Sequence, residues 1–189
     1  MTDSEVTTMA KESPPGELGM AAPPFSLRAT DGRTYTLADV RGAHGVVVAF
    51  ICNHCPYVKA ALPAMTRDAV ALRAYGIGFV GINANDARTY PEDSYNAMVA
   101  LTEEVELPFL YLRDETQAVA RAYGAVCTPE FFGFDAGLKL RYRGRLDASR
   151  KDAVPGARRD LLEAMREVAH EGRAGTEQFP ALGCSIKWR

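Results

Sequence analysis

The sequence has no apolar run long enough to cross a bilayer. Its longest uninterrupted apolar run extends from Gly45 to Cys52, well short of the roughly 20 residues that a membrane helix requires, and this length suits a buried strand. Residues 1–20 also lack the basic start and the apolar stretch of a secretory signal peptide. We therefore expect a soluble, cytoplasmic protein with no membrane partner.

An excess of charge of one sign is also lacking. The chain carries 22 Lys and Arg residues against 24 Asp and Glu residues, a formal net charge of −2 at pH 7, so the composition gives no reason to expect a nucleic-acid partner. Arg141, Arg143 and Arg145 alternate and would share one face of a strand. We interpret this face as a solvated sheet edge rather than an anion site.

The length and composition indicate one globular domain with appendages. The chain has 189 residues, of which 47% are hydrophobic and 24% charged, enough to bury a core. Residues 1–20 contain little apolar material and are expected to be a flexible leader. Residues 21–172 should form the domain, and residues 173–189 a C-terminal extension that packs on it.

Short apolar runs and helical periodicities alternate along the domain. A β-hairpin is expected at its start, over 24–29 and 34–37, with the turn at Asp31-Gly32. Buried strands then alternate with helices, and an antiparallel hairpin and a last helix follow. This order predicts an α/β fold with a central mixed sheet flanked by helices; its expected strands are 46–51, 77–82, 109–112, 130–135 and 138–143, and its expected helices 58–72, 91–104, 115–123 and 161–169.

The spacing of two cysteines provides the clearest chemical motif. Cys52-Asn53-His54-Cys55 stands where a buried strand passes into a helix, and the free amides of a helix N-terminus favour a thiolate at Cys52. Cys55 lies one turn further on and could attack Cys52 in a mixed disulfide. A protonated His54 would further stabilise the Cys52 thiolate, so Asn53 and His54 are candidate modulating residues.

Three interpretations of this cysteine pair are open: an inert buried pair, half of a zinc site, or a dithiol redox centre. A structural zinc site needs four ligands, and the chain has no second Cys-x-x-Cys and no His-x-x-x-His. Cys127 and Cys184 could complete such a site only through folding. The dithiol centre is the interpretation that the motif's position favours.

Six segments stand out besides the order of strands and helices: Cys52-Asn53-His54-Cys55-Pro56-Tyr57-Val58, Asn83-Ala84-Asn85-Asp86, Tyr90-Pro91-Glu92-Asp93-Ser94, Cys127-Thr128-Pro129-Glu130-Phe131-Phe132, Tyr142-Arg143-Gly144-Arg145 and Gly183-Cys184-Ser185-Ile186-Lys187-Trp188. Together they resemble the thioredoxin superfamily, and within it a peroxiredoxin-like branch close to the alkyl hydroperoxide reductase and thiol-specific antioxidant (AhpC/TSA) family. The resemblance covers about residues 21–189. It implies a thioredoxin-like fold in which a cis Pro129 opposes the cysteine motif and the backbone of Thr128 pairs with an extended substrate strand.

The departures from the peroxiredoxin pattern matter as well. Alignment on Cys55-Pro56 makes Cys55 the equivalent of the peroxidatic cysteine, but Cys52 then replaces the family's Thr or Ser, and Val48 replaces its proline. The arginine that the family carries near the later strand is missing, and the Thr128-Pro129 region stands in its place. Peroxide would lose its positioned donors, so we expect weak peroxidase activity or none.

The two remaining cysteines are possible accessory residues. Cys127 stands two positions before Pro129 and is expected near Cys52. Cys184 is expected to be an inert small residue, in a tail that Ile186 and Trp188 dock onto the domain.

The resulting prediction is a thiol–disulfide oxidoreductase in which Cys52 attacks a disulfide and Cys55 resolves the mixed disulfide. No organic cofactor is required. The expected partners are protein or small-molecule disulfides and a dithiol or small-thiol electron donor. The alternatives are a thiol peroxidase that uses Cys55 or Cys52, and a module that binds zinc or copper(I) through Cys52, Cys55 and one of His54, Cys127 or Cys184.

Overall fold

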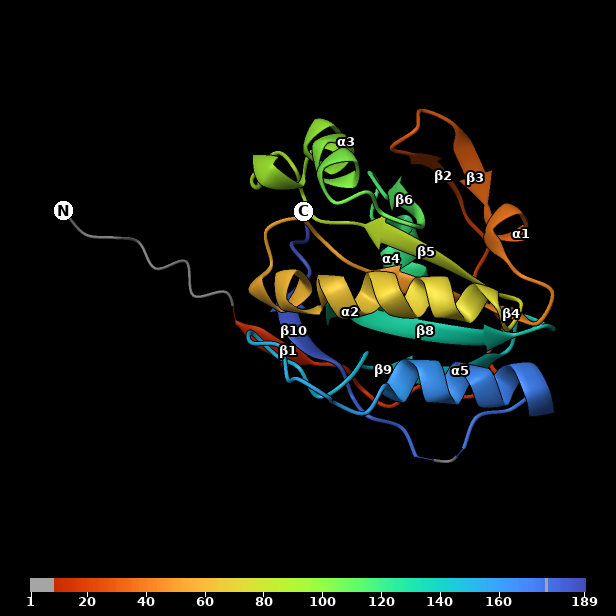
Figure 1. Ribbon diagram of the computed structural model, residues 1–189. Coiled ribbons are helices and arrows are strands. Elements are labelled where there is room, and N and C mark those ends of the chain that lie inside the picture. Colours follow the sequence, from red (N-terminus) through yellow and green to blue (C-terminus); the bar gives the residue numbers. More distant parts are fainter. Residues whose placement is uncertain (1–8, 176) are drawn as a thin grey trace.

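The computed structural model describes residues 9–175 and 177–189. A mixed sheet forms the centre of the molecule, and helices cover both of its faces (Figure 1). Its strands are β2 (Ser26–Ala29), β3 (Thr34–Thr36), β4 (Gly45–Phe50), β5 (Ile77–Asn83), β6 (Leu110–Arg113), β8 (Glu130–Asp135) and β9 (Leu140–Gly144). A smaller sheet contains β1 (Ala10–Glu12), β7 (Cys127–Thr128) and β10 (Leu182–Ser185). The helices are α1 (Leu37–Val40), α2 (Pro56–Arg73), α3 (Tyr95–Glu104), α4 (Ala118–Tyr123) and α5 (Asp160–Glu171), with a 3-10 turn η1 (Pro91–Asp93).

The central sheet has the order β3-β2-β6-β5 followed by β4-β8-β9. A hydrogen bond from Ile51 N to Ile82 O, 3.0 Å long, joins the two parts just beyond the end of β4. The pair β5–β6 is parallel, whereas β2–β3, β4–β8 and β8–β9 are antiparallel. The predicted mixed sheet and both predicted hairpins are therefore confirmed.

Alternation along β4 divides the core into two layers. Val47, Ala49 and Ile51 face a cluster that includes residues of α2 and α5, which run side by side across one face of the sheet (Figure 1). Val46, Val48 and Phe50 face the other cluster, which includes residues of α4. Because successive side chains of a strand point to opposite faces, the continuous apolar run is explained by burial on both sides.

The N-terminal segment differs from the expected flexible leader. β1 pairs antiparallel with β10, with Ala10 opposite Cys184, and Ser13 N donates to Ala181 O at 2.9 Å. Gly19 N donates to Leu140 O at 2.8 Å. Backbone pairing thus ties this segment to the C-terminal strand and to β9, and the rest of the expected leader, residues 1–8, lies outside the described part of the chain.

The alternating arginines do not form a solvated edge. Arg143 is buried and donates through Nε and Nη2 to Glu130 Oε1, at 2.8 and 2.6 Å, and Glu130 is fully buried. A buried carboxylate requires such a partner. Arg141 and Arg145, each 34% exposed, pair with Asp135 and Asp160. The interpretation was wrong because β9 packs against α5 and the C-terminal segment instead of facing water.

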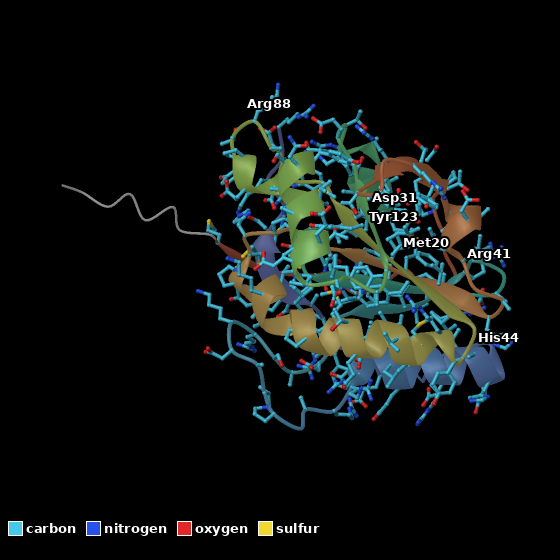
Figure 2. The ribbon with its side chains drawn as sticks, turned by 45° about the horizontal axis from the view of Figure 1, so that its top comes forward. Met20, Asp31, Arg41, His44, Arg88 and Tyr123 are labelled. Carbon is cyan, nitrogen blue, oxygen red and sulfur yellow. The ribbon has the colours of Figure 1, made fainter. Side chains whose placement is uncertain are left out.

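The loops at the two ends of the sheet lie far apart. Figure 2 shows Arg41 and His44 at one end of the molecule and Arg88, in the loop between β5 and η1, at the other. The helix α2 begins at the end that carries Arg88 (Figure 1).

Among the described residues, the helices are all too short or too polar to span a membrane.

Candidate functional site

The cysteine motif lies between the end of β4 and the start of α2, as the sequence predicted. Cys55 is the N-cap residue of α2 and Pro56 is its first residue, a position where proline removes no helical hydrogen bond. Cys52 and Cys55 are both fully buried. The strand-to-helix junction thus places two thiols at a helix N-terminus but within the protein.

Thr128 contacts the sulfur atoms of both cysteines. Its Oγ1 lies 3.3 Å from Cys52 Sγ, and its carbonyl oxygen lies 3.3 Å from Cys55 Sγ. The peptide bond between Thr128 and Pro129 is cis. The residues that the resemblance placed opposite the motif therefore lie against it in the structure.

The backbone of Thr128 is not free to pair with a substrate strand. β10 occupies that edge of β7, with Cys184 opposite Thr128 and Ser185 opposite Cys127. The expectation of a substrate strand at this position therefore needs correction. The competing strand is the C-terminal segment of the same chain, whose position no local pattern indicates.

The same strand brings a third cysteine into the site. Cys184 is buried, and its Sγ lies 2.7 Å from Cys55 Sγ. Cys127 points to the other side of its strand, where its Sγ lies 4.0 Å from Glu130 Oε2. Of the two accessory cysteines, Cys184 is the one whose sulfur contacts the motif, although the sequence analysis expected it to be a packing residue.

The electrostatics favour a thiolate on Cys55 rather than on Cys52. Burial raises the pKa of Cys52 well above its usual value. Hydrogen bonding with the sulfurs of Cys184 and Cys52, together with the Val58 amide, lowers the pKa of Cys55. The hydrogen bond to Cys55 and burial both raise the pKa of Cys184. The sequence predicts the thiolate on Cys52 from its place at the helix N-terminus, but this position alone does not reveal the contact between Cys55 and Cys184.

His54 pairs with a carboxylate that the sequence analysis did not single out. Its Nδ1 lies 2.5 Å from Asp93 Oδ2, and its ring stacks on Tyr90 with an interplanar angle of 3°. The hydrogen bond to Asp93 raises the pKa of His54, against the opposing effect of partial burial. Asp93 therefore anchors the His54 ring beside the cysteine motif and favours its protonated form.

Asp93 is fully buried in a set of hydrogen-bond donors. Its Oδ1 accepts from Asn53 N at 2.7 Å and from Asn83 Nδ2 at 3.3 Å, and its Oδ2 accepts from Asn85 Nδ2 at 2.9 Å. Burial alone would raise the pKa of Asp93, but the hydrogen bonds from His54, Asn85 and Asn53 outweigh it and lower the pKa. Asp93 is therefore an anion that orders the motif.

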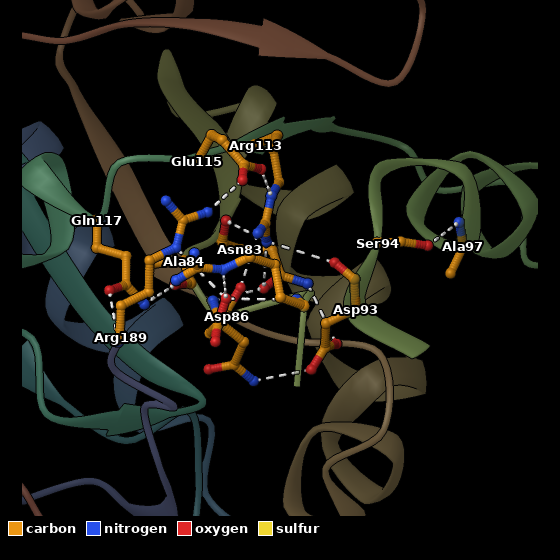
Figure 3. A network of polar contacts seen from close by, with 12 residues as sticks. Asn83, Ala84, Asp86, Asp93, Ser94, Ala97, Arg113, Glu115, Gln117 and Arg189 are labelled. Atoms are coloured by element: carbon orange, nitrogen blue, oxygen red, sulfur yellow. Dashed lines mark hydrogen bonds and ion pairs between the residues drawn. The ribbon is translucent and has the colours of Figure 1, made fainter. Parts of the chain in front are cut away.

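Asn53 is fixed by three partners. Besides its backbone bond to Asp93, its Nδ2 donates to Glu92 O at 2.9 Å and its Oδ1 accepts from Tyr111 Oη at 2.9 Å. Figure 3 shows the surrounding network, in which Arg113 reaches the loop after β5; its Nη2 donates to Asn85 O at 2.7 Å. Asn53 thus positions the motif rather than presenting a group to substrate.

A sequence signal for this network did exist. The segment 83–86, which contains two Asn and one Asp, begins at the last residue of β5, and polar residues at the carboxyl end of a parallel strand often line a site. Asp93 is the last residue of η1 and lies in a segment that carries the family resemblance, but no periodicity or spacing assigns its carboxylate a role. Its connection to Asn83 and Asn85 required the tertiary fold.

Three of these residues could also hold a metal ion. Donor atoms of Cys52, His54 and Asp93 lie within 4.8 Å of one another. A thiolate, an imidazole and a carboxylate are a ligand set that zinc accepts. The sequence suggests Cys52, Cys55 and one of His54, Cys127 or Cys184 as metal ligands. In the structure the carboxylate of Asp93 joins Cys52 and His54 instead, so the metal hypothesis has a different set of three ligands.

The family comparison matches most of the chain. The AhpC/TSA family profile covers residues 18–143. Peroxiredoxin Q, a chloroplastic protein of Oryza sativa subsp. japonica, is 28% identical over 106 residues, which make up 56% of this chain and 45% of that protein. The chain thus spans about half the length of the curated relatives that it matches.

Solved structures include two with a high TM-score. A conserved uncharacterized protein from Geobacillus kaustophilus is 45% identical with a TM-score of 0.90, covering 96% of this chain and 97% of its own. A hypothetical protein from Sinorhizobium meliloti 1021 is 36% identical with a TM-score of 0.88, covering 94% and 98%. The thioredoxin domain of a thiol-disulfide oxidoreductase from Bacteroides vulgatus shares the fold, at 18% identity and a TM-score of 0.58 over 72% and 91% of the two chains.

Proposed function

The chain belongs to the AhpC/TSA family, and we propose that it is a thiol–disulfide oxidoreductase that works through the Cys52–Cys55 dithiol. It is a thioredoxin-fold redox protein with a Cys-x-x-Cys pair. The proposal adds the activity, the roles of the two cysteines and the class of substrate, a protein or small-molecule disulfide.

One observation carries the proposal. The two sulfurs of the motif meet Thr128 at a helix N-terminus, both within 3.3 Å of its oxygen atoms, and Cys55 has a lowered pKa. A thiol that forms a mixed disulfide needs a second thiolate within reach to resolve it. Cys55, whose pKa is lowered and which stands three residues after Cys52, is the candidate for that resolving thiolate.

The reaction proceeds in two exchange steps. Cys52 Sγ attacks a sulfur of the substrate disulfide, so a Cys52–substrate bond forms, the substrate S–S bond breaks, and the electron pair leaves on the departing sulfur. The Cys52 proton moves to the departing substrate sulfur, which leaves as a thiol. Cys55 Sγ then attacks Cys52 Sγ, which releases the second substrate thiolate and leaves a Cys52–Cys55 disulfide. The substrate gains two electrons, which a dithiol or small thiol restores to the protein.

His54 and the cavity beside Pro129 support the assigned roles. The protonated His54 would stabilise negative charge at the motif as Cys52 becomes a thiolate. A cavity of about 120 Å³, lined in part by Tyr57, Pro129 and Leu182, lies beside the cis-proline. Substrate approach from this side would require a small displacement of the segment that covers the buried sulfurs.

Trapping tests the assignment of roles. Cys55→Ser removes the resolving thiol, so with an insulin-type disulfide as substrate it should accumulate a mixed disulfide on Cys52, detectable by mass spectrometry after alkylation. Cys127→Ser, which alters a buried cysteine outside the motif, should reduce insulin at the wild-type rate. If Cys52→Ser traps the substrate and Cys55→Ser does not, the roles are reversed; if neither variant traps it, the proposed activity is wrong.

A thiol peroxidase is the second candidate, and the lowered pKa of Cys55 favours it. Cys55 is also the residue that aligns with the peroxidatic cysteine, and peroxiredoxin Q is among the similar proteins. The groups that lower this pKa are thiols and the backbone amides of Val58 and Cys184, which do not reproduce the hydroxyl and guanidinium donors of a peroxide site. Peroxide loss measured with stoichiometric hydroperoxide should be slow; rapid loss that depends on Cys55 would favour the peroxidase.

A further inference from the structure

The C-terminal strand takes the place that a substrate strand would occupy beside Thr128. Its seating depends on Gly183, because a Cβ there would lie 2.0 Å from the carbonyl oxygen of Thr128. Beyond the strand, Ile186 N donates to Val126 O at 3.1 Å. Glycine at 183 therefore allows the two backbones to approach closely, and this approach sets the position of the next residue, Cys184.

The tail beyond β10 is anchored on the loop that surrounds the site. Lys187 N donates to Asn85 Oδ1 at 2.9 Å, and Lys187 O accepts from Asp86 N and Gln117 Nε2, both at 2.8 Å. Figure 3 shows Gln117 beside Arg189 in this network, and Gln117 Oε1 accepts from Arg189 N at 3.0 Å. On the other edge of β10, β1 completes the ladder. The position of Cys184 is therefore fixed by the strands that pair with β10 and by the anchored residues that follow it in the sequence.

The sulfur atoms of Cys55 and Cys184 are close enough for a bond to form with little movement. They lie 2.7 Å apart, and a disulfide bond is about 2.05 Å long. Cys184 is only 2% exposed, so its thiol reacts most readily with a sulfur inside the site. Cys55, which also lies beside Cys52, is that partner.

We propose that Cys184 is a third redox cysteine, which exchanges with the Cys52–Cys55 disulfide to give a Cys55–Cys184 disulfide; this inference rests on the proposed function. Cys184 Sγ attacks Cys55 Sγ, so the Cys55–Cys184 bond forms and the Cys52–Cys55 bond breaks. The electron pair of the broken bond leaves on Cys52, which takes up the proton that Cys184 loses. The exchange is an isomerisation, with no net oxidation or reduction and no co-reactant.

The exchange changes what the oxidised protein presents. Before the exchange, Cys52 is bonded to Cys55 in the motif disulfide, and the cysteines of the chain that remain thiols are Cys184 and Cys127. After it, Cys52 is again a thiol next to Thr128 and His54, and the oxidising equivalents are stored between the start of α2 and β10. The electron donor then reduces a disulfide that includes the C-terminal strand.

Peptide mapping distinguishes the two disulfides. Trypsin releases Cys52 and Cys55 together in the peptide 42–59 and Cys184 in the peptide 174–187, while Cys127 falls in 122–139. The full-length protein is oxidised with oxidised glutathione, quenched with acid and N-ethylmaleimide, and digested without reductant. We expect a covalent link between peptides 42–59 and 174–187 in addition to the internally oxidised peptide 42–59.

Three variants make the test decisive. Cys52→Ser should convert fully to the linked peptides, because Cys184 is then the neighbouring thiol of Cys55. Cys184→Ser should lose the link but keep the internal disulfide, and Cys127→Ser should behave as the wild type. Circular dichroism establishes that each variant is folded.

The outcomes separate this inference from the proposed function. If the wild type forms the internal disulfide but never the link, and Cys55 and Cys184 both react with N-ethylmaleimide in oxidised Cys52→Ser, then Cys184 is not a redox residue and the proposed function stands. If oxidation gives neither disulfide in the wild type, the proposed function fails as well. A link between Cys184 and Cys127 would also overturn the inference.

Discussion

Replacement of Gly183 by alanine should separate the two disulfides that the site can form. The added Cβ would lie 2.0 Å from the backbone oxygen of Thr128, and real Cβ contacts are essentially never below 3.0 Å. The strand must therefore move by about 1 Å or more, since neither backbone can yield independently in a packed interior. If Cys184 moves with it, its sulfur leaves the 2.7 Å contact with Cys55 and bond formation becomes unfavourable.

The cost in stability should be moderate. Overpacking a well-packed site costs about 1–3 kcal/mol, which lowers the melting temperature of a chain of this size by roughly 2–4 °C per kcal/mol. The variant should therefore fold, with a melting temperature several degrees below that of the wild type. In its peptide map, the Cys55–Cys184 link should fall at least tenfold relative to the Cys52–Cys55 disulfide, while the latter persists.

A matched glycine controls for the general effect of alanine. Gly175 lies in the same C-terminal segment, and a Cβ there would lie 3.2 Å from the carboxylate oxygen of Glu167, a flexible side chain. Gly175→Ala should leave both disulfides and the melting temperature close to wild type. A Gly183→Ala protein that melts and cross-links like the wild type would refute the reasoning that the close backbone approach positions Cys184.

Other parts of the site give further predictions. Asp93→Asn should lower the pKa of His54, because the carboxylate raises that pKa. NMR titration of the His54 ring protons measures this shift, and an unchanged pKa would contradict the pairing. The ion pair between His54 and Asp93 contributes its full stabilisation below the unfolded histidine pKa of about 6.5. In the wild type this contribution should be lost as the pH rises through the higher folded pKa. The denaturation midpoint should fall over the same pH range. Glu130→Gln should destabilise the fold by about 3–5 kcal/mol, since it leaves Arg143 as an unpaired buried charge; a loss below 1 kcal/mol in chemical denaturation would argue against this. A chelator should leave the insulin reduction rate unchanged if the dithiol acts without metal, and a lasting loss of activity that zinc restores would support the metal hypothesis instead.

Two buried carboxylates, those of Asp93 and Glu130, lie on either side of the site, and hydrogen-bond donors offset the cost of burying them. Asp93 and Glu130 are both fully buried, and each is surrounded by donors: Glu130 Oε2 accepts from Val126 N at 2.8 Å and from Cys127 N at 3.3 Å. Satisfied carboxylates of this kind fix the loops that carry them, since an unpaired buried charge is costly. One orders the Cys52–Cys55 segment and the other orders the turn that leads to Pro129. The two sides of the site are thus held in place by separate ionic anchors.

Sequence reasoning worked best where local physics decides the structure. The apolar run through β4 and the periodicity of α2 depend on which face of each element is buried, and both are legible in the order of residues. The Cys-x-x-Cys spacing at the junction of strand and helix follows from the same local pattern. The position of Thr128 and Pro129 against the motif came from family resemblance, which supplied a tertiary contact that periodicity does not contain.

The sequence by itself therefore determined the α/β class, the strand-to-helix placement of Cys52 and Cys55, and the redox chemistry that the motif indicates. Only the tertiary structure decided that Thr128 pairs with the protein's own C-terminal strand, that Cys184 lies against Cys55, and that Asp93 holds His54. These contacts join residues between 39 and 129 positions apart in the chain. No local periodicity encodes them, because they depend on which distant segments the packed core leaves side by side. The contact that lowers the pKa of Cys55 depends on them in turn.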